Sequence, residues 1–391
     1  MISSSSIVRQ QFNKLGILLL ICLSLRAAIP ARHNSHAVTV AVFGLFRPER
    51  VDITTPHNAV VSIQSGSAEV KRVLGSGQRL QVECRGEQLE VKVFEHDQRL
   101  LLTSSADAVR TEETVCTLSV PGRIQRDFSG RVEVVVRQGQ VLPRVTVQEE
   151  VAVQQILRSE MAGAQELEAL KAQAILVRSY LRTATRRHQN DGYGFCDSTH
   201  CQFFTDFKTA DDRFRQAAIA TRGLVLTFLG RPFQPLYTAA CGGQTLARFA
   251  DTNQKLGEDY PYRSVSCSFC VRHPLFEWET TIATQELLRA LKEESARDSS
   301  ETMASLAEPG EAGELGALKQ ATRIRVGRVL GWNVIRSNRY SIELQSDSVK
   351  IRGHGSGHNF GFCQAGAIEL SKQGKSMAEI LSFYFPGSRI E

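Results

Sequence analysis

The pattern of apolar and polar positions changes once along the chain, near residue 148. Before that point, short apolar runs such as "AVTVAVFGLF" at 37–46 and "RVEVVV" at 131–136 are separated by Gly, Asp, Asn and Ser. Short runs rich in β-branched residues and bounded by turn formers are typical of antiparallel strands. We therefore predict a mainly antiparallel β region over residues 38–148.

Beyond residue 148 the apolar positions recur at helical spacing. Residues 147–161 and 164–188 predict two helices separated by Gly163, and the second carries an apolar stripe at Leu167, Leu170, Ala174, Val177 and Leu181. We also expect helices at 211–223 and 283–294, strands at 224–230, 235–241, 323–330 and 339–345, and two short helices within 367–387. The predicted fold class is α+β, with a mixed α+β domain over residues 149–391.

Two segments differ from this pattern. Arg9 and Lys14 precede an apolar run, Leu15 to Leu25, and the small-x-small sequence Ser35-His36-Ala37 follows. This is the pattern of a secretory signal peptide, over residues 1–37, and the run is short for a bilayer span. An uncleaved membrane anchor is the alternative, and either reading predicts an extracytoplasmic protein. Residues 295–316 are rich in Ser, Glu, Ala and Gly, which predicts a flexible insertion.

Composition excludes some partners. The 391 residues are 42% hydrophobic and carry a net charge of +6, with Lys and Arg scattered and no aromatic interleaving. This distribution argues against nucleic-acid binding. The glycines at 353–361 do not have the spacing of a dinucleotide-binding loop, which argues against a nucleotide. A mildly basic surface suits an anionic polymer such as a cell-wall glycan.

The predicted compartment determines how the cysteines are interpreted. Besides Cys22, which lies in the apolar run, the chain has eight: Cys84, Cys116, Cys196, Cys201, Cys241, Cys267, Cys270 and Cys363. Spaced pairs in an oxidising compartment are disulfide candidates, although sequence does not give their connectivity. A bridge between the predicted strands of Cys84 and Cys116 is one option. Around "CSFCVRH" at 267–273 we expect a disulfide rather than a second metal site.

The segment "GFCDSTHCQFF" at 194–204 favours a metal. Cys196, His200 and Cys201 are zinc ligands at short spacing, and His188 is the natural fourth candidate. Four protein ligands would make a structural zinc site, whereas three ligands and a water would make a catalytic one. A Cys196–Cys201 disulfide is the remaining alternative.

Other polar residues are candidates for a ligand site. Glu160 ends the first predicted helix, where partial burial would raise its pKa and suit it to general acid chemistry. A solvated surface glutamate is the alternative. Gln173 and Tyr180 share one face of the second helix, with Arg178 close by, but polar groups at this spacing are also common on surfaces.

The glycine-rich stretch "GHGSGHNFGFCQAGA" at 353–367 contains His358 and Gln364. Its glycines permit close backbone approach and positive φ. A loop of this kind with polar side chains is suited to form the floor of a ligand groove. A tight structural turn is the alternative.

In their order along the chain, "ILRSEM…ELEALKAQAILVRSYL", "CDSTHCQ", "AACGGQT" and "GHGSGHNFGFCQAGA…GKSMAEILSFYFPG" resemble the SpoIID/LytB family of stage II sporulation protein D and amidase enhancers. The resemblance covers about residues 145–390, except 295–316. It implies a catalytic domain with a central groove that acts on peptidoglycan. Active members are lytic transglycosylases that prefer glycan strands stripped of peptides, and others enhance a partner amidase.

The resemblance also assigns roles to residues. It implies Glu160 as the catalytic acid, a metal-binding segment at Cys196, His200 and Cys201 with His188, and substrate contacts from Gln173, Arg178, Tyr180, His358 and Gln364. In the glycine-rich motif, Ser356 stands where Trp is usual, Asn359 where Gly is usual, and Ala365 where an aromatic is frequent. These departures remove stacking surface for sugars and put the substrate preference in question.

The implied reaction needs one carboxyl group. A protonated glutamate donates its proton to the oxygen that links N-acetylmuramic acid to N-acetylglucosamine. The carboxylate then removes a proton from the muramic C6 hydroxyl, which closes on C1 and leaves a 1,6-anhydro end. Two other functions fit the sequence: a non-catalytic glycan-binding activator of an amidase, and a zinc hydrolase with an open metal site.

Overall fold

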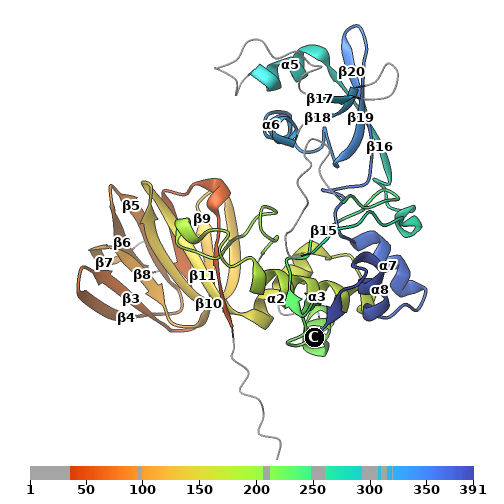
Figure 1. Cartoon of the computed structure of the whole chain (residues 1–391). Helices are drawn as coiled ribbons and strands as arrows, with labels where there is room; N and C mark the ends of the chain where they lie inside the picture. The colour runs from red at the N-terminus through yellow and green to blue at the C-terminus, as the bar shows by residue number, and fades with distance from the viewer. Residues whose placement is uncertain are drawn as a thin grey trace, which may run out of the picture. The chain divides into compact units, whose positions relative to one another are not determined.

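A computed structural model of the chain describes residues 36–95, 99–205, 212–247, 260–292, 307–309, 315–318 and 320–391. The predicted signal peptide therefore lies outside the described residues, apart from its last two positions. The described part is α+β, with a mainly β region first and a mixed region after it (Figure 1).

The described residues of the β region form eleven strands, and some of these, such as β11, alternate in burial. They are β1 (Ala37–Ala41), β2 (Arg50–Thr54), β3 (Ala59–Ser65), β4 (Ala68–Leu74), β5 (Gln78–Arg85), β6 (Gln88–Glu95), β7 (Arg99–Ala106), β8 (Ala108–Thr111), β9 (Thr114–Val120), β10 (Ile124–Arg137) and β11 (Gln140–Gln148). Their pairings with one another are antiparallel. The prediction of an antiparallel region is confirmed.

Strand β10 connects the two parts of this sheet. Its first half pairs with β9, and its second half pairs with β11 and β8. The main order is β12-β1-β11-β10-β9-β2-β5-β6-β7, where β12 (Phe195–Cys196) joins β1 in parallel. Alternate residues such as Phe128, Val132 and Val134 are fully buried, because successive side chains of a strand point to opposite faces.

The possible bridge between Cys84 and Cys116 is not formed, and all eight described cysteines are unbridged. Strand β2 lies between β5, which carries Cys84, and β9, which carries Cys116. Cys84 lies beside Glu49, before β2 begins, whereas Thr117 pairs with Thr54 at the other end of β2. The two thiols are therefore separated both across the sheet and along it.

The helices are α2 (Glu149–Glu160), α3 (Leu167–Thr183), α4 (Asp212–Ala220), α5 (Thr284–Lys292), α6 (Gln320–Leu330), α7 (Gln364–Lys372) and α8 (Met377–Tyr384). The stripe predicted on α3 is confirmed, since Leu170, Ala174 and Val177 are fully buried. Strand β11 runs directly into α2, so the β region and the helical region share one chain segment at Gln148.

The strand predicted at 323–330 is wrong, because these residues belong to helix α6. Their alternation of Arg with Ile or Val resembles a half-buried strand. In the structure, Val326 and Leu330 instead lie one helical turn apart and pack in an apolar cluster with Leu287 and Leu291 of α5. Tertiary packing overrides the local pattern here.

A five-stranded sheet accompanies α5 and α6, in the order β16-β20-β19-β18-β17. Its strands are β16 (Glu277–Ala283), β17 (Ala307–Pro309), β18 (Leu315–Leu318), β19 (Arg339–Leu344) and β20 (Ser348–His354). It has its own apolar cluster around Trp278, Tyr340 and Ile351. Strands β17 and β18 fall partly within the predicted insertion at 295–316, whose other residues lie outside the described part.

Short strands complete the helical region. The order β14-β13-β22 joins Arg231–Pro232, Leu226–Phe228 and Arg389–Ile390, and β15 (Tyr237–Thr238) pairs in parallel with β21 (Phe362–Cys363). None of the helices described here has both the length and the hydropathy required to span a bilayer.

Candidate functional site

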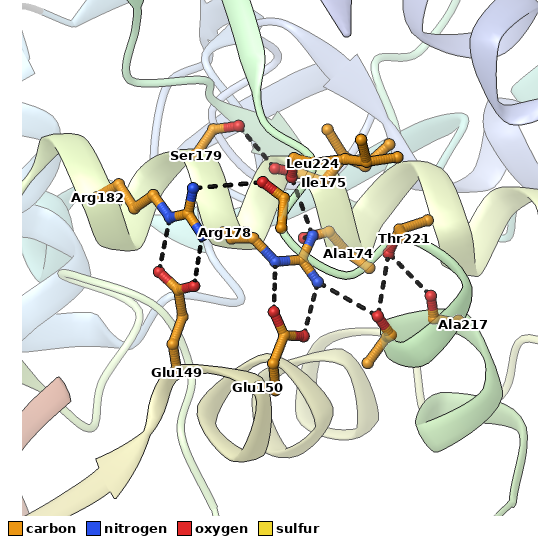
Figure 2. Close-up of polar contacts among 12 residues, drawn as sticks. Glu149, Glu150, Ala174, Ile175, Arg178, Ser179, Arg182, Ala217, Thr221 and Leu224 are labelled. Atoms are coloured by element: carbon orange, nitrogen blue, oxygen red, sulfur yellow. Dashed lines mark hydrogen bonds and ion pairs between the residues drawn. The ribbon is translucent and has the colours of Figure 1, made fainter. Parts of the chain in front are cut away.

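Two ion pairs fix α2 against α3, and the one made by Arg178 is the more buried. The Arg178 side chain is fully buried, and its Nε and Nη2 donate to Glu150 Oε1 and Oε2 at 2.9 and 2.8 Å. Its Nη1 also donates to the Leu224 carbonyl at 3.0 Å. Arg182 holds Glu149 in the same two-point way, as Figure 2 shows. The Arg178 guanidinium is thus engaged in bonds that hold the fold together. The structure does not support its expected role in binding substrate.

Glu160 lies at the other end of α2, as predicted. Its Oε1 accepts a hydrogen bond from the Phe203 N–H at 2.7 Å. Burial raises the pKa of the Glu160 carboxyl, and the Phe203 N–H and the Tyr237 hydroxyl oppose that rise only in part. None of these influences is a cation. The surroundings of Glu160 therefore favour its protonated form, as a general acid requires.

Tyr237 is a site residue that the sequence reasoning missed. It lies on β15, and its buried hydroxyl faces Glu160 but has no well-formed hydrogen bond within the part of the chain that the structure describes. Burial raises the pKa of Tyr237 well above its usual value. The phenol therefore remains neutral and can donate a hydrogen bond. A tyrosine in the predicted strand "PLYTAAC" just before the glycine pair was the available signal.

His358 adjoins Tyr237. Burial and, to a smaller extent, the nearby Arg323 guanidinium lower the pKa of His358 to about 4, although a hydrogen bond with the Tyr237 backbone opposes both. Its Nδ1 accepts from the Phe360 N–H at 3.0 Å. His358 is therefore neutral near pH 7. A neutral imidazole beside Tyr237 can act as a hydrogen-bonding group toward a ligand.

Gln364 lies close to the same strand pair. It is the first residue of α7 and follows Cys363, which pairs with Thr238 of β15. Its side-chain amide nitrogen is buried and has no hydrogen-bond partner among the described residues. Buried polar groups usually have partners, so an unpartnered amide is a candidate ligand contact.

Gln173 and Tyr180 lie on α3 and are buried. Gln173 has no exposed surface, and neither polar atom of its side-chain amide has a hydrogen-bond partner among the described residues, so its contact with substrate stays a prediction. Tyr180 packs against Phe195, and its hydroxyl lies near the Cys201 thiol. Tyr180 also influences Tyr237 electrostatically. Tyr180 therefore lies near both the thiol-rich loop and Tyr237.

The four predicted metal ligands come together. One ligand atom from each of His188, Cys196, His200 and Cys201 lies within 4.8 Å of all the others. His200 Nδ1 is 3.6 Å from Cys196 Sγ and 3.8 Å from Cys201 Sγ. Neighbouring ligands of tetrahedral zinc are separated by about 3.3–3.8 Å, which follows from Zn–N and Zn–S bonds of about 2.1 and 2.3 Å.

A further contact suits this cluster to zinc. His188 Nδ1 lies 2.9 Å from Asp191 Oδ2, while its Nε2 is buried and has no hydrogen-bond partner among the described residues. A metal-bound imidazole typically donates its second N–H to a carboxylate, which fixes the tautomer and directs the other nitrogen to the metal. The residues present therefore fit zinc, and Asp191 is a supporting residue that the sequence reasoning did not single out.

The thiol-rich loop is also attached to the β region. Strand β12 pairs with β1, the Phe43 N–H donates to Asp197 Oδ2 at 2.9 Å, and Arg126 lies 3.3 Å from the same oxygen. Phe203 follows Cys201 by two positions. The loop that carries the cluster thus also places the N–H group that binds Glu160.

The glycine-rich stretch packs backbone against backbone. Gly355 has a positive φ, and a side chain there would collide with the Ala240 carbonyl oxygen. Asn359 has a φ of 62°, and its Nδ2 donates to the Cys241 carbonyl at 3.1 Å. Asparagine tolerates this left-handed conformation, which explains how it can stand where the family usually has glycine. The tight-turn interpretation holds for these glycines.

Comparisons with known proteins cover part of the candidate site. A family model described as stage II sporulation protein matches residues 138–228, a range that includes Glu160 and the four candidate metal ligands. The chain is 23% identical over 257 residues to stage II sporulation protein D of Bacillus subtilis, and 24% identical over 291 residues to the amidase enhancer of the same species. The predicted resemblance to the SpoIID/LytB family is therefore confirmed for the part of the chain that these comparisons cover.

The SpoIID relatives are matched over part of their length. An uncharacterised protein of Brachyspira hyodysenteriae is 25% identical over 240 residues, which is 60% of this chain and 64% of that protein. The match covers 60% of this chain in both Bacillus proteins, 72% of the sporulation protein and 39% of the amidase enhancer. The chain thus spans less than two thirds of two of these relatives. Tyr237, His358 and Gln364 lie outside the matched SpoIID segment.

Proposed function

We propose that this protein is an extracytoplasmic lytic transglycosylase that cleaves the MurNAc–GlcNAc bond of peptidoglycan strands stripped of peptides. The observation that carries the proposal is the environment of Glu160. Its carboxyl is held by a backbone N–H, faces a neutral phenol and has its pKa raised by burial. The resemblance to stage II sporulation protein D and to the amidase enhancer supports peptidoglycan as the substrate class.

In the proposed reaction Glu160 is protonated at rest. It donates this proton to the glycosidic oxygen as the C1–O bond breaks, and GlcNAc leaves as the free alcohol. The resulting Glu160 carboxylate is stabilised by the hydrogen bond from Phe203 N–H, and Tyr237 can donate another. It then accepts the proton of the muramic C6 hydroxyl, whose oxygen bonds to C1. General acid–base catalysis of this kind contributes roughly 10²- to 10⁴-fold in rate.

Neighbouring residues would orient the sugar. His358 is neutral near pH 7, and Gln364 has an unpartnered amide nitrogen, so both can hydrogen-bond to hydroxyl or acetamido groups. One carboxyl group suffices for this reaction, because the sugar's own hydroxyl takes the place of water. This contrasts with hydrolytic glycosidases, which use a pair of carboxyl groups.

His188, Cys196, His200 and Cys201 would hold a zinc ion. A four-ligand zinc site is structural, and zinc would supply folding free energy rather than chemistry. The loop it closes ends at Phe203, whose N–H holds Glu160. In this proposal, these four residues affect catalysis only because they fix the position of the Phe203 N–H.

The proposed location rests on two observations. The N-terminal residues have the pattern of a signal peptide, or of a membrane anchor if they are not removed. The named relatives are a sporulation protein and an amidase enhancer. Glycan strands of the cell wall are the proposed partner.

The test is digestion of peptide-free glycan strands by the purified protein, followed by mass spectrometry. We expect disaccharide fragments that end in 1,6-anhydro-MurNAc, and loss of these products in Glu160→Gln. Glu168→Gln is a matched control, since Glu168 also accepts a backbone N–H, from Met377 at 2.8 Å. Reducing ends in place of anhydro ends, or unchanged rates in Glu160→Gln, would contradict the proposal.

A second candidate is a glycan-binding activator of a cell-wall amidase. It is motivated by the relative named amidase enhancer and by Ser356, which stands where many family members have Trp. In this case the protein binds glycan strands and stimulates an added amidase but releases no fragments alone. Co-sedimentation with glycan in the absence of cleavage, by wild type and Glu160→Gln alike, distinguishes this function from the first.

A further inference from the structure

A second sulfur cluster lies apart from the four predicted ligands. The Sγ atoms of Cys241, Cys267, Cys270 and Cys363 all lie within 4.8 Å of one another, and no residue of the four is more than 1% exposed. We propose that these four cysteines bind a second zinc ion as a structural four-thiolate site. This site is independent of the proposed glycan chemistry.

The topology brings these thiols together from three segments. Cys241 follows β15, and Cys363 ends its partner strand β21. Cys267 and Cys270 form a Cys-x-x-Cys pair around a short 3₁₀ turn, and the Cys267 N–H donates to the Gly243 carbonyl at 2.9 Å. A Cys-x-x-Cys turn with two further cysteines is the usual ligand arrangement of a structural zinc site.

The distances favour a single metal ion over disulfides. Cys241 Sγ and Cys270 Sγ are 3.6 Å apart. Two thiolates on tetrahedral zinc are separated by about 3.8 Å, given a Zn–S bond of about 2.3 Å. A disulfide joins its sulfurs at about 2.05 Å and needs only two of them. Thiolates around an iron–sulfur cluster lie further apart, because the atoms of the cluster separate them.

Hydrogen-bond donors surround the sulfurs. The N–H groups of Cys241 and Gly366 each donate to Cys363 Sγ at 3.3 Å, and the Tyr384 hydroxyl lies 3.3 Å from Cys267 Sγ. Hydrogen bonds of this kind stabilise metal-bound thiolates. Cys363 is also the N-cap of α7, where the positive end of the helix dipole offsets negative charge. A four-thiolate zinc site carries a net charge of −2, so both effects favour it.

The start of α7 is shaped to approach this cluster. A side chain on Gly366 would collide with the Tyr384 hydroxyl and with Cys267 Sγ. On the other side of the cluster, Arg339 Nη1 holds the chain that follows β15, since it donates to the carbonyls of Cys241 and Gly242 at 3.2 and 2.8 Å. The site would therefore join β15, which carries Tyr237, to the helix that begins at Gln364.

The sequence favoured a disulfide among these cysteines, and the geometry points to a metal instead. The sequence gives the Cys-x-x-Cys pair but does not show that Cys241 and Cys363 meet there. Burial also affects whether these thiols remain reduced in an oxidising compartment. Thiolates that are bound to metal and shielded from solvent react slowly with oxidants.

The test is the zinc content of the full-length protein, purified without chelator, with thiols counted by alkylation and mass spectrometry after unfolding. If both clusters bind metal, we expect two zinc ions per wild-type chain. The double variant Cys196→Ser/Cys201→Ser isolates the second cluster and should retain one. Cys84→Ser is the matched control, because Cys84 is unbridged and belongs to neither cluster.

The variant that lacks the first cluster keeps this proposal separate from the proposed function. One zinc ion in that variant supports the second site, even if wild type also binds only one. Replacement by Co²⁺ should then give the intense sulfur-to-metal charge-transfer band of a tetrahedral four-thiolate site. No zinc in that variant, with either two disulfides or free thiols among these cysteines, would overturn the proposal. This measurement does not require that a Cys267→Ser/Cys270→Ser protein folds.

Discussion

The two ends of helix α2 place the same side chain in opposite surroundings. At its start, Glu150 is held by the buried guanidinium of Arg178. At its end, Glu160 accepts a hydrogen bond from a backbone N–H and faces the Tyr237 phenol, and burial raises its pKa. The helix dipole acts in the same sense, because it stabilises a negative charge at the first turn and destabilises one at the last turn. One helix thus carries a carboxylate that supports the fold and a carboxyl group suited to donate a proton.

The largest effect is expected when either carboxyl group is replaced by an amide. Glu160→Gln should lower the rate of glycan cleavage by roughly 10²- to 10⁴-fold, the usual contribution of general acid–base catalysis, with little change in melting temperature. Glu150→Gln should lower the melting temperature and leave the turnover per folded molecule unchanged. Rates and thermal melts of both variants check this, and equal loss of activity in both would remove the contrast.

The next largest effect is expected from removal of the Arg178 guanidinium. Arg178→Met should leave Glu150 without its buried partner and lower the free energy of unfolding by about 3–5 kcal/mol, the usual cost of breaking a buried ion pair. Arg182→Met is the matched control. The Arg182 side chain is 29% exposed and its bonds to Glu149 are the same in kind, so its loss should cost less. Urea unfolding of both variants measures the difference. An equal cost would show that burial does not distinguish the two pairs.

A smaller effect is expected at the thiol-rich loop next to Glu160. Asp191→Asn should lower the zinc affinity of the His188 cluster by about 10- to 100-fold, as is typical for loss of a carboxylate behind a metal-bound histidine. Competition with a chromophoric chelator measures this affinity. The buried cluster at Cys241 should be unaffected, since Asp191 does not belong to it. Unchanged affinity would mean that Asp191 does not orient His188.

The smallest effect is in the pH dependence of stability. The pKa of Glu160 is raised above 4.5 in the folded state, so its contribution favours folding at low pH and is lost as pH rises through the folded pKa. Relative to Glu160→Gln, wild type should therefore lose melting temperature as pH increases from about 4.5. Cleavage should decline over the same pH window, as the acid loses its proton. A difference between the two proteins that does not vary with pH would contradict the raised pKa.

Local patterns predicted local features of this protein well. The first cluster lies within residues 188–201, so its spacing indicated three ligands with His188 as a fourth candidate, and the structure brings all four together. Glu160 was predicted at a helix end from a local pattern as well. The antiparallel strands before residue 148 followed from short β-rich runs bounded by turn formers, and the stripe on α3 followed from a period of 3.6.

Features that depend on distant segments were not predictable. The second cluster joins Cys241 to Cys363 across 122 positions, and Tyr237 meets Glu160 through the β15–β21 pair. Arg178 looked like a site residue because it is polar and lies near Tyr180, yet its partner Glu150 is on another helix. Residues 323–330 had a strand-like alternation, but packing against α5 makes them a helix. In each case a contact distant in sequence decided the outcome.

The pairing of early with late segments has a consequence for biogenesis. Strand β13 finds its partner in β22, and Cys241 meets Cys363 only when residues near the end of this sequence have been made. At 5–20 residues per second, synthesis of the intervening chain takes on the order of ten seconds. During that time Cys241, Cys267 and Cys270 have been synthesised but Cys363 has not. The nascent chain is therefore most vulnerable to wrong thiol pairing before α7 and α8 emerge.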